Sequence, residues 1–350
     1  MEASQKRLDY LDLLKGFAIF LVVMGHFLAW TFPLNAERAG FSVFVKDAIY
    51  SFHMPLFFFV SGYLVDLKQK DWNWNTCVTV VKKRAQSLLL PGFSFLLLLY
   101  VRTGTVYFEW FLKVLFEMYL IYVITRMLSH YLFKRGTLEI VLHVVMIALL
   151  FIAKPFVSGM ALNEILSYTS FCYSYPYFVL GYVCCRFGLN KFIVSKDYVY
   201  SVALVAWCVL FLWKGGLSFF GKQYIVAMSA IIVCVKFAQG VDFGNPSLLV
   251  RTLMRWGKIS LAIYLVSPVL IPWFPELGMY FIKADSYEPF GNVTHSLHVT
   301  TVFLQSVSGI AVSIYVCVAC SLIKKIVQKS AVLNFVLFGE GKLMPTKEKR

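Results

Sequence analysis

The stretch LDLLKGFAIFLVVMGHF, from Leu11 to Phe27, is apolar enough to cross a membrane, yet it contains three ionisable residues: Asp12, Lys15 and His26. A helix that crosses the hydrocarbon core needs about 20 predominantly apolar residues, and charged groups within it are costly. Ionisable residues in such a helix therefore indicate a functional site.

The spacing of these residues predicts a shared helix face. Lys15 and His26 are eleven residues apart, which at about 100° per residue is only about 20° from whole turns and about 16 Å along the axis. Asp12 precedes Lys15 by three residues, so the two are neighbours near one helix end. A long ligand with an anionic head and a reactive tip would fit this face. In the alternative interpretation, the Asp–Lys pair only snorkels to the interface and His26 bonds a backbone carbonyl.

The composition predicts a membrane protein. The 350 residues are 59% hydrophobic and only 15% charged, with a mean hydropathy of +0.72. A water-soluble globule cannot bury that much apolar surface. The net charge of +15 is compatible with a nucleic-acid partner, but no basic stripe with interleaved aromatic residues occurs on a polar surface, so no nucleic-acid binding is expected.

The hydropathy pattern predicts an all-α integral membrane protein, with about ten transmembrane helices in a single bundle and no soluble domain. The expected spans are residues 10–31, 41–66, 86–101, 106–128, 137–153, 170–187, 198–213, 221–238, 257–282 and 297–323. Most of the 33 Lys and Arg residues lie in alternate segments between spans, which favours cytoplasmic termini. We therefore expect a transmembrane domain at 1–330 and a basic cytoplasmic tail at 331–350.

The cysteines and the first span need no special chemistry. Most of the eight cysteines lie within expected spans, where a free thiol behaves as a small apolar residue. Cys317 and Cys320 have zinc-like spacing but no second ligand pair, so no metal is expected. The first span lacks a small-residue cleavage site, and we expect it to remain in the protein.

The second span, SFHMPLFFFVSGYL from Ser51 to Leu64, adds further polar groups. Pro55 is expected to kink the helix, and Gly62 allows close approach of another helix or a ligand. His53 and Ser61 each require a polar partner in lipid. The three phenylalanines between them are interpreted as packing residues.

These stretches together resemble the acyltransferase-3 family of membrane O-acyltransferases, which acetylate bacterial surface sugars. The matching motifs are RLDYLDLLKGFAIFLVVMGHF, with a basic residue, ten intervening residues and a histidine, then SFHMPLFFFVSGYL, then KKRAQSLLLPGF from Lys82. Weaker matches to the family pattern are WFLKVLF from Trp110, YFVLGY from Tyr177 and GKISLAIYL from Gly257. The likeness covers most of the chain in the right order.

The resemblance implies that acetyl-coenzyme A (acetyl-CoA) is the cytoplasmic acyl donor. The implied acceptor is a hydroxyl of a cell-surface carbohydrate or of its lipid-linked precursor. The implied location is the bacterial cytoplasmic (inner) membrane, where membrane lipids surround the chain. His26 would be the general base that takes the hydroxyl proton as the oxygen attacks the thioester. Lys15, Lys83 and Arg84 would hold phosphates of the donor, with Asp12 orienting Lys15.

The site residues expected on this basis fall into two groups. Those for catalysis are His26, Asp12 and His53, and those for donor binding are Lys15, Lys83, Arg84 and Ser61. For the basic run at 82–84 the positive-inside rule alone also predicts Lys and Arg.

Three positions depart from the family pattern. Lys15 stands where arginine is commoner, which keeps the charge but loses the bidentate fork. Ser87 stands where a second arginine often follows the first, so anion binding would be weaker or supplied elsewhere. Ser267 stands where histidine is often found.

The competing functional class is a multi-span transporter or flippase of a carbohydrate or an anionic small molecule. Such proteins usually show inverted repeats with corresponding broken helices, and no internal repeat is visible in this sequence. A non-catalytic membrane scaffold would not need ionisable residues on one helix face.

Overall fold

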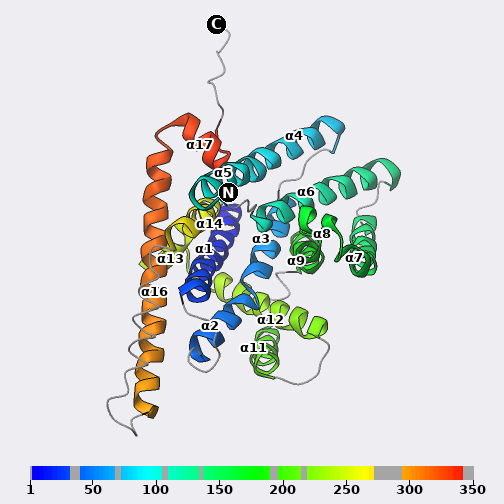
Figure 1. The fold of residues 1–350 in the computed structure, drawn as a ribbon. Coiled ribbons are helices and arrows are strands. Elements are labelled where there is room, and N and C mark those ends of the chain that lie inside the picture. Colours follow the sequence, from blue (N-terminus) through cyan, green and yellow to red (C-terminus); the bar gives the residue numbers. More distant parts are fainter. Residues whose placement is uncertain are drawn as a thin grey trace. The chain divides into compact units, whose positions relative to one another are not determined.

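In the computed structural model of the protein, every element in the described part of the chain is a helix (Figure 1). The residues that the structure describes are 2–31, 40–67, 72–104, 109–133, 137–189, 196–213, 219–271 and 294–341. The chain divides into two compact units. The first comprises Met1–Phe57 and Phe192–Lys324, and the second comprises Phe58–Lys191 and Lys325–Arg350.

The first unit is built around its N-terminal helix. Its helices are α1 (Glu2–Thr31), α2 (Gly40–Tyr50), α11 (Asp197–Leu212), α12 (Phe219–Gln239), α13 (Leu248–Lys258), α14 (Ser260–Leu270) and most of α16 (Thr294–Val327). Helix α1 packs against α13, α2, α14 and α12, and α11 pairs with α12 (Figure 1). The Lys15 and His26 helix is thus the core of this unit.

The second unit gathers helices from the middle and the end of the chain. Its elements are most of α3 (His53–Val65), α4 (Trp74–Arg84), the π-helical turn η1 (Ala85–Leu89), α5 (Leu90–Thr103), α6 (Trp110–Leu128), the π-helical turn η2 (Ser129–Phe133), α7 (Thr137–Val157), α8 (Ala161–Leu166), α9 (Tyr168–Phe187) and α17 (Ala331–Phe338). Helix α6 contacts α4, α7 and α9, and α17 packs on α5. The first part of the expected C-terminal tail is therefore a packed helix.

Among the described residues, each unit contains a helix pair that crosses at two glycines. In the first unit a Cβ on Gly16 of α1 would overlap the carbonyl oxygen of Leu253 on α13, and a Cβ on Gly257 would overlap that of Asp12. Such close crossings are typical of membrane helices with small residues at the contact. Phe20 and Trp256 stack beside this crossing with ring centroids 6.1 Å apart.

The second unit repeats this arrangement with α3 and α9. A Cβ on Gly62 would overlap the carbonyl oxygen of Phe178, and a Cβ on Gly181 would overlap that of Phe59. The expectation that Gly62 allows close approach of another helix is thus met by α9.

Among the described residues, six helical segments are long and apolar enough to cross a membrane, or up to seven if a bent pair counts as one span. The six are Asp9–Thr31, Phe44–Val65, Trp74–Val101, Glu139–Val157, Gly221–Gln239 and Val307–Val327. Helices also occupy the other expected positions, but α6 carries Lys113, Glu117 and Arg126, and α11 is short. Large apolar side chains remain exposed on α7 and α12, such as Phe156 (71%) and Phe237 (72%), as lipid-facing surfaces require.

Several helix boundaries differ from the expected spans. The helix containing the basic run begins at Trp74 rather than at residue 86, because Asn73 caps it by accepting a hydrogen bond from the Thr76 amide at 2.8 Å. The expected span 257–282 instead begins inside α13, and α13 and α14 meet at an angle of 88°. Residues 272–282 of that span lie outside the described residues. Pro55 does not kink a continuous helix, because it lies in the first turn of α3, where proline is tolerated. The interruption between α2 and α3 falls before it, at residues 51–52.

Candidate functional site

The paired charges on α1 lie where that helix crosses α13. The Lys15 Nζ is 2.7 Å from Asp12 Oδ1, and both side chains are partly exposed. The carbonyl of Asp12 is the group against which Gly257 packs. Because a lysine ammonium has three N–H donors, this single ion pair leaves capacity for an anionic ligand. The pair is therefore fixed in place but not saturated.

His26 lies in the second half of α1 and stacks on Trp30, with ring centroids 4.7 Å apart and an interplanar angle of 9°. Its Nδ1 atom is buried and has no hydrogen-bond partner within the part of the chain that the structure describes. A buried polar atom without a partner requires an explanation, and a bound group that completes the hydrogen bond is one.

His53 is buried in the same unit and has a defined tautomer. Its Nδ1 lies 2.7 Å from the carbonyl oxygen of Ile49, and a carbonyl can only accept a hydrogen bond, so Nδ1 carries the proton. The Nε2 lone pair of His53 is then the basic position of the ring.

Helix packing brings the two histidines into one region of the first unit. Gly25, which precedes His26, packs against the ring of Tyr50, where an added Cβ would come within 2.8 Å of Cε2. The Tyr50 ring in turn meets the His53 ring edge to face at 4.9 Å.

Arg84 is the donor-binding candidate with the clearest local geometry. It ends α4 just before the π-helical turn η1, and its guanidinium carbon lies 4.0 Å from the centroid of the Tyr119 ring on α6. The side chain is half-buried and forms no ion pair with any described residue. Stacking on an aromatic face orients the planar guanidinium and leaves its N–H edges available for an anion. The neighbouring Lys83 is exposed.

The remaining predicted residue, Ser61, is half-buried on α3 beside the Gly62 crossing with α9. It belongs to the second unit, as do Lys83 and Arg84, whereas Lys15 belongs to the first. The structure pairs Lys15 with Asp12 and places His26 near His53. No hydrogen bond joins Ser61 and Arg84 among the described residues.

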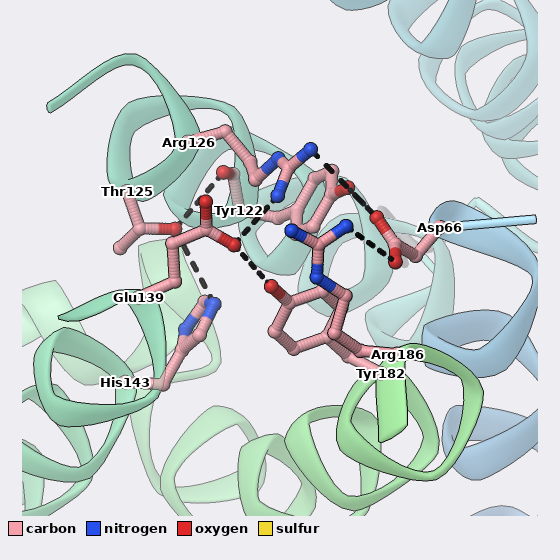
Figure 2. A network of polar contacts seen from close by, with 8 residues as sticks. All are labelled: Asp66, Tyr122, Thr125, Arg126, Glu139, His143, Tyr182 and Arg186. Atoms are coloured by element: carbon pink, nitrogen blue, oxygen red, sulfur yellow. Dashed lines mark hydrogen bonds and ion pairs between the residues drawn. The ribbon is translucent and has the colours of Figure 1, made fainter. Parts of the chain in front are cut away.

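The second unit contains a buried polar network that sequence reasoning missed (Figure 2). Arg126 of α6 donates from Nη1 to Glu139 Oε2 of α7 at 2.6 Å, and the Tyr182 hydroxyl of α9 donates to the same oxygen. Asp66, just after α3, lies 3.9 Å from Arg126 Nη2 and 3.7 Å from Arg186 Nη1. Two carboxylates thus balance two guanidinium groups.

A buried histidine extends this network along α7. The Thr125 hydroxyl donates to the Tyr122 carbonyl at 2.9 Å, so its oxygen can accept from His143 Nε2 at 3.4 Å. His143 Nδ1 then accepts from the Tyr175 hydroxyl at 2.6 Å. Both ring nitrogens have protein partners and the side chain is fully buried, so this histidine joins helices α6, α7 and α9.

The signal for this network was present in the sequence. Glu139 and His143 are ionisable residues in Glu139–Val157, the most apolar of the candidate spans. Arg126, near the end of an expected span, also fits the cytoplasmic charge bias without any partner. Pairing Arg126 with Glu139 required knowledge of which helices are neighbours.

Comparisons with known proteins agree with the motifs. A family model described as an acyltransferase domain, Acyl_transf_3, matches residues 8–322. Nodulation protein NolL of Sinorhizobium fredii is 49% identical over 53 residues, which cover 15% of this chain and 14% of NolL. NolL of Mesorhizobium japonicum is 34% identical over 99 residues, which cover 28% of this chain and 25% of that protein.

The chain thus spans no more than about a quarter of the length of the curated relatives that it matches. No solved structure matches. The family model, in contrast, covers nearly the whole chain, including the helices that carry His26, His53 and Arg84. The protein is therefore a multi-pass membrane protein that belongs to the acyltransferase-3 family.

Proposed function

We propose that the protein is a membrane-bound O-acyltransferase that moves an acetyl group from cytoplasmic acetyl-CoA to a hydroxyl of a cell-surface carbohydrate or of its lipid-linked precursor. The observation that carries this proposal is the family match over residues 8–322.

The proposed reaction exchanges a thioester for an ester. The acceptor oxygen attacks the acetyl carbonyl carbon, a C–O bond forms, and the C–S bond to the coenzyme breaks. The hydroxyl proton passes to an imidazole and from there to the departing thiolate. His26 is the proposed base, and the absence of a partner at its buried Nδ1 supports a ligand-facing role.

His53 is the alternative base. Its Nδ1–H is held by the Ile49 carbonyl, which resembles the way catalytic histidines are oriented by a second hydrogen bond. In the proposal with His26 as base, His53 keeps this bond and acts as a neighbouring polar group.

Donor binding is proposed to rest on charged hydrogen bonds to the phosphates of the coenzyme. Arg84 supports this role, because it is half-buried, stacks on Tyr119 and has no carboxylate partner among the described residues. Lys15, Lys83 and Ser61 are further proposed contacts, and Asp12 orients Lys15 at 2.7 Å.

The decisive experiment expresses the chain in a bacterial host with a defined surface polysaccharide. Mass spectrometry of the isolated polysaccharide should show new O-acetyl groups of about 42 Da each, and they should be absent with His26→Ala at equal protein level. A polysaccharide that moves across the membrane without any added acetyl group would instead indicate a transporter or flippase.

A further inference from the structure

The helix that carries Arg84 has an irregular turn directly after this residue. In η1 the Leu90 amide bonds to the Ala85 carbonyl, five residues earlier, in place of the α-helical four. A π-helical turn accommodates one extra residue, and such turns occur frequently at functional sites. One residue corresponds to about 100° of helix rotation, so this turn sets the direction of Arg84 relative to α5.

The C-terminal segment is bound to this turn. Gln86 Nε2 donates to the carbonyls of Gly339 at 2.9 Å and Gly341 at 3.1 Å. The Ser94 hydroxyl of α5 donates to the Val336 carbonyl of α17 at 2.7 Å. The Phe338 side chain is 1% exposed and lies 6.3 Å from the ring of Phe95.

The contact at Gly339 is one of backbone against backbone. An added Cβ on Gly339 would overlap the Gln86 carbonyl oxygen and would lie 2.9 Å from Ser87 Cα. Gly339 also has φ +64, in the left-handed region that ends α17. The overlap disfavours any Cβ at this position, and the left-handed φ adds to the preference for glycine.

The docked segment lies outside the family match, which ends at residue 322. It reaches the turn at Ser87, the position where the family pattern often has a second arginine. A small residue at position 87 is compatible with the close approach of Gly339. The departure from the family pattern and the docking of α17 therefore occur at the same place.

We propose that Gln86 is a positioning residue, which docks the C-terminal segment on η1 and thereby holds Arg84 in the orientation that binds the phosphates of the donor. This inference rests on the proposed function for the role of the donor, but the docking itself is independent of it. Without the docked C-terminal segment, the π-helical turn is free to relax to the α-helical register. Arg84 then rotates away from its position on Tyr119.

The test uses the full-length protein in detergent or in membranes, with Gln86→Leu and Gly339→Ala as the variants. Gly104→Ala is the matched control, because Gly104 also ends a helix with a positive φ, +70, but a Cβ there would contact nothing within 4 Å. Two quantities are measured: the hydrogen exchange of the peptide 331–338, and the KM for acetyl-CoA with its kcat.

Both variants should accelerate exchange in α17 and raise the KM for acetyl-CoA about tenfold, the scale expected for losing hydrogen-bond partners, with little change in kcat. Gly104→Ala should alter neither quantity. Faster exchange in α17 with an unchanged KM would mean that the segment only packs, and would overturn the positioning role. Unchanged exchange in both variants would overturn the docking. Absence of acetyl transfer by the wild-type protein would contradict the proposed function, and the exchange of α17 would still decide whether Gln86 holds the segment.

Discussion

Two arginines of the second unit illustrate how the surroundings of a single side chain decide its role. Arg126 is buried and paired with Glu139 at 2.6 Å, so its charge is already compensated. Arg84 is stacked on Tyr119 and has no carboxylate partner among the described residues. A cation in the second state can bind an anionic ligand without first breaking an ion pair.

Arg84→Ala should therefore raise the KM for acetyl-CoA about ten- to a hundredfold, the loss of about 1.5–3 kcal/mol expected for a charged hydrogen bond. Steady-state kinetics on membranes measure this effect. Lys82→Ala, at an exposed position in the same turn that is not among the proposed donor contacts, is the control and should leave the KM nearly unchanged. Equal KM values for the wild type and Arg84→Ala would assign Arg84 to membrane topology alone.

His26→Ala should reduce O-acetylation by at least two to four orders of magnitude, because a positioned general base contributes about that much. His26→Gln, which keeps a polar side chain but cannot accept the proton, should fail almost as completely. Both variants should retain normal protein levels and affinity for acetyl-CoA.

The matched comparison for this prediction is His53→Gln. It removes the Nε2 lone pair of His53 while leaving a side chain that can donate to the Ile49 carbonyl. If His26→Gln remained active and His53→Gln were inactive, the roles of the two histidines would be reversed.

Among the helices, the two glycine crossings are the most sensitive contacts. Gly16→Ala should destabilise the protein by more than the about 1–3 kcal/mol typical of overpacking, because the new Cβ meets the Leu253 backbone, which cannot rotate away. Gly181→Ala should do the same at the α3–α9 crossing. Gly159→Ala, with open space around its Cβ, is the control, and thermal unfolding in detergent provides the measurement. A melting temperature for Gly16→Ala equal to that of Gly159→Ala would contradict the crossing.

The polar network joins α6, α7 and α9 to the end of α3 through a balanced set of charges (Figure 2). Glu139→Gln should destabilise the protein by about 3–5 kcal/mol, because it leaves Arg126 without its closest carboxylate in a buried site. Glu164→Gln, at an exposed carboxylate on α8, should leave the unfolding temperature nearly unchanged. Acetyl transfer by the folded fraction of Glu139→Gln should persist, because none of the proposed catalytic or donor-binding residues belongs to this network.

For the molecule as a whole, the distribution of Lys and Arg predicts that both termini are cytoplasmic. A reporter that works only in the cytoplasm should be active when fused after Arg350. A reporter that works only in the periplasm should be active when inserted near Lys283. Lys283 lies outside the described residues. Reporters that place the two ends of the chain on opposite sides would show that the number of spans is odd.

The sequence predicted the helical class, the membrane location and the family, because these depend on composition, hydropathy and motifs within single helices. The close approach at Gly62 was also readable, since it depends on one small residue in an apolar run. The partners of Arg126, the cation–π contact of Arg84 and the docking of α17 were not readable. Each of them joins residues on different helices, and a hydropathy pattern contains no information on which helices are neighbours.

The glycine crossings also have a genetic consequence. Glycine is the only amino acid without a Cβ, so each of the nineteen replacements at Gly16, Gly62, Gly181 or Gly257 introduces the same overlap with a backbone carbonyl. In a saturation-mutagenesis library selected for function, these four codons should therefore be depleted of every missense allele, conservative or not. The codon for Gly159 should tolerate many of the same alleles, and the contrast would map the two crossings without any structural measurement.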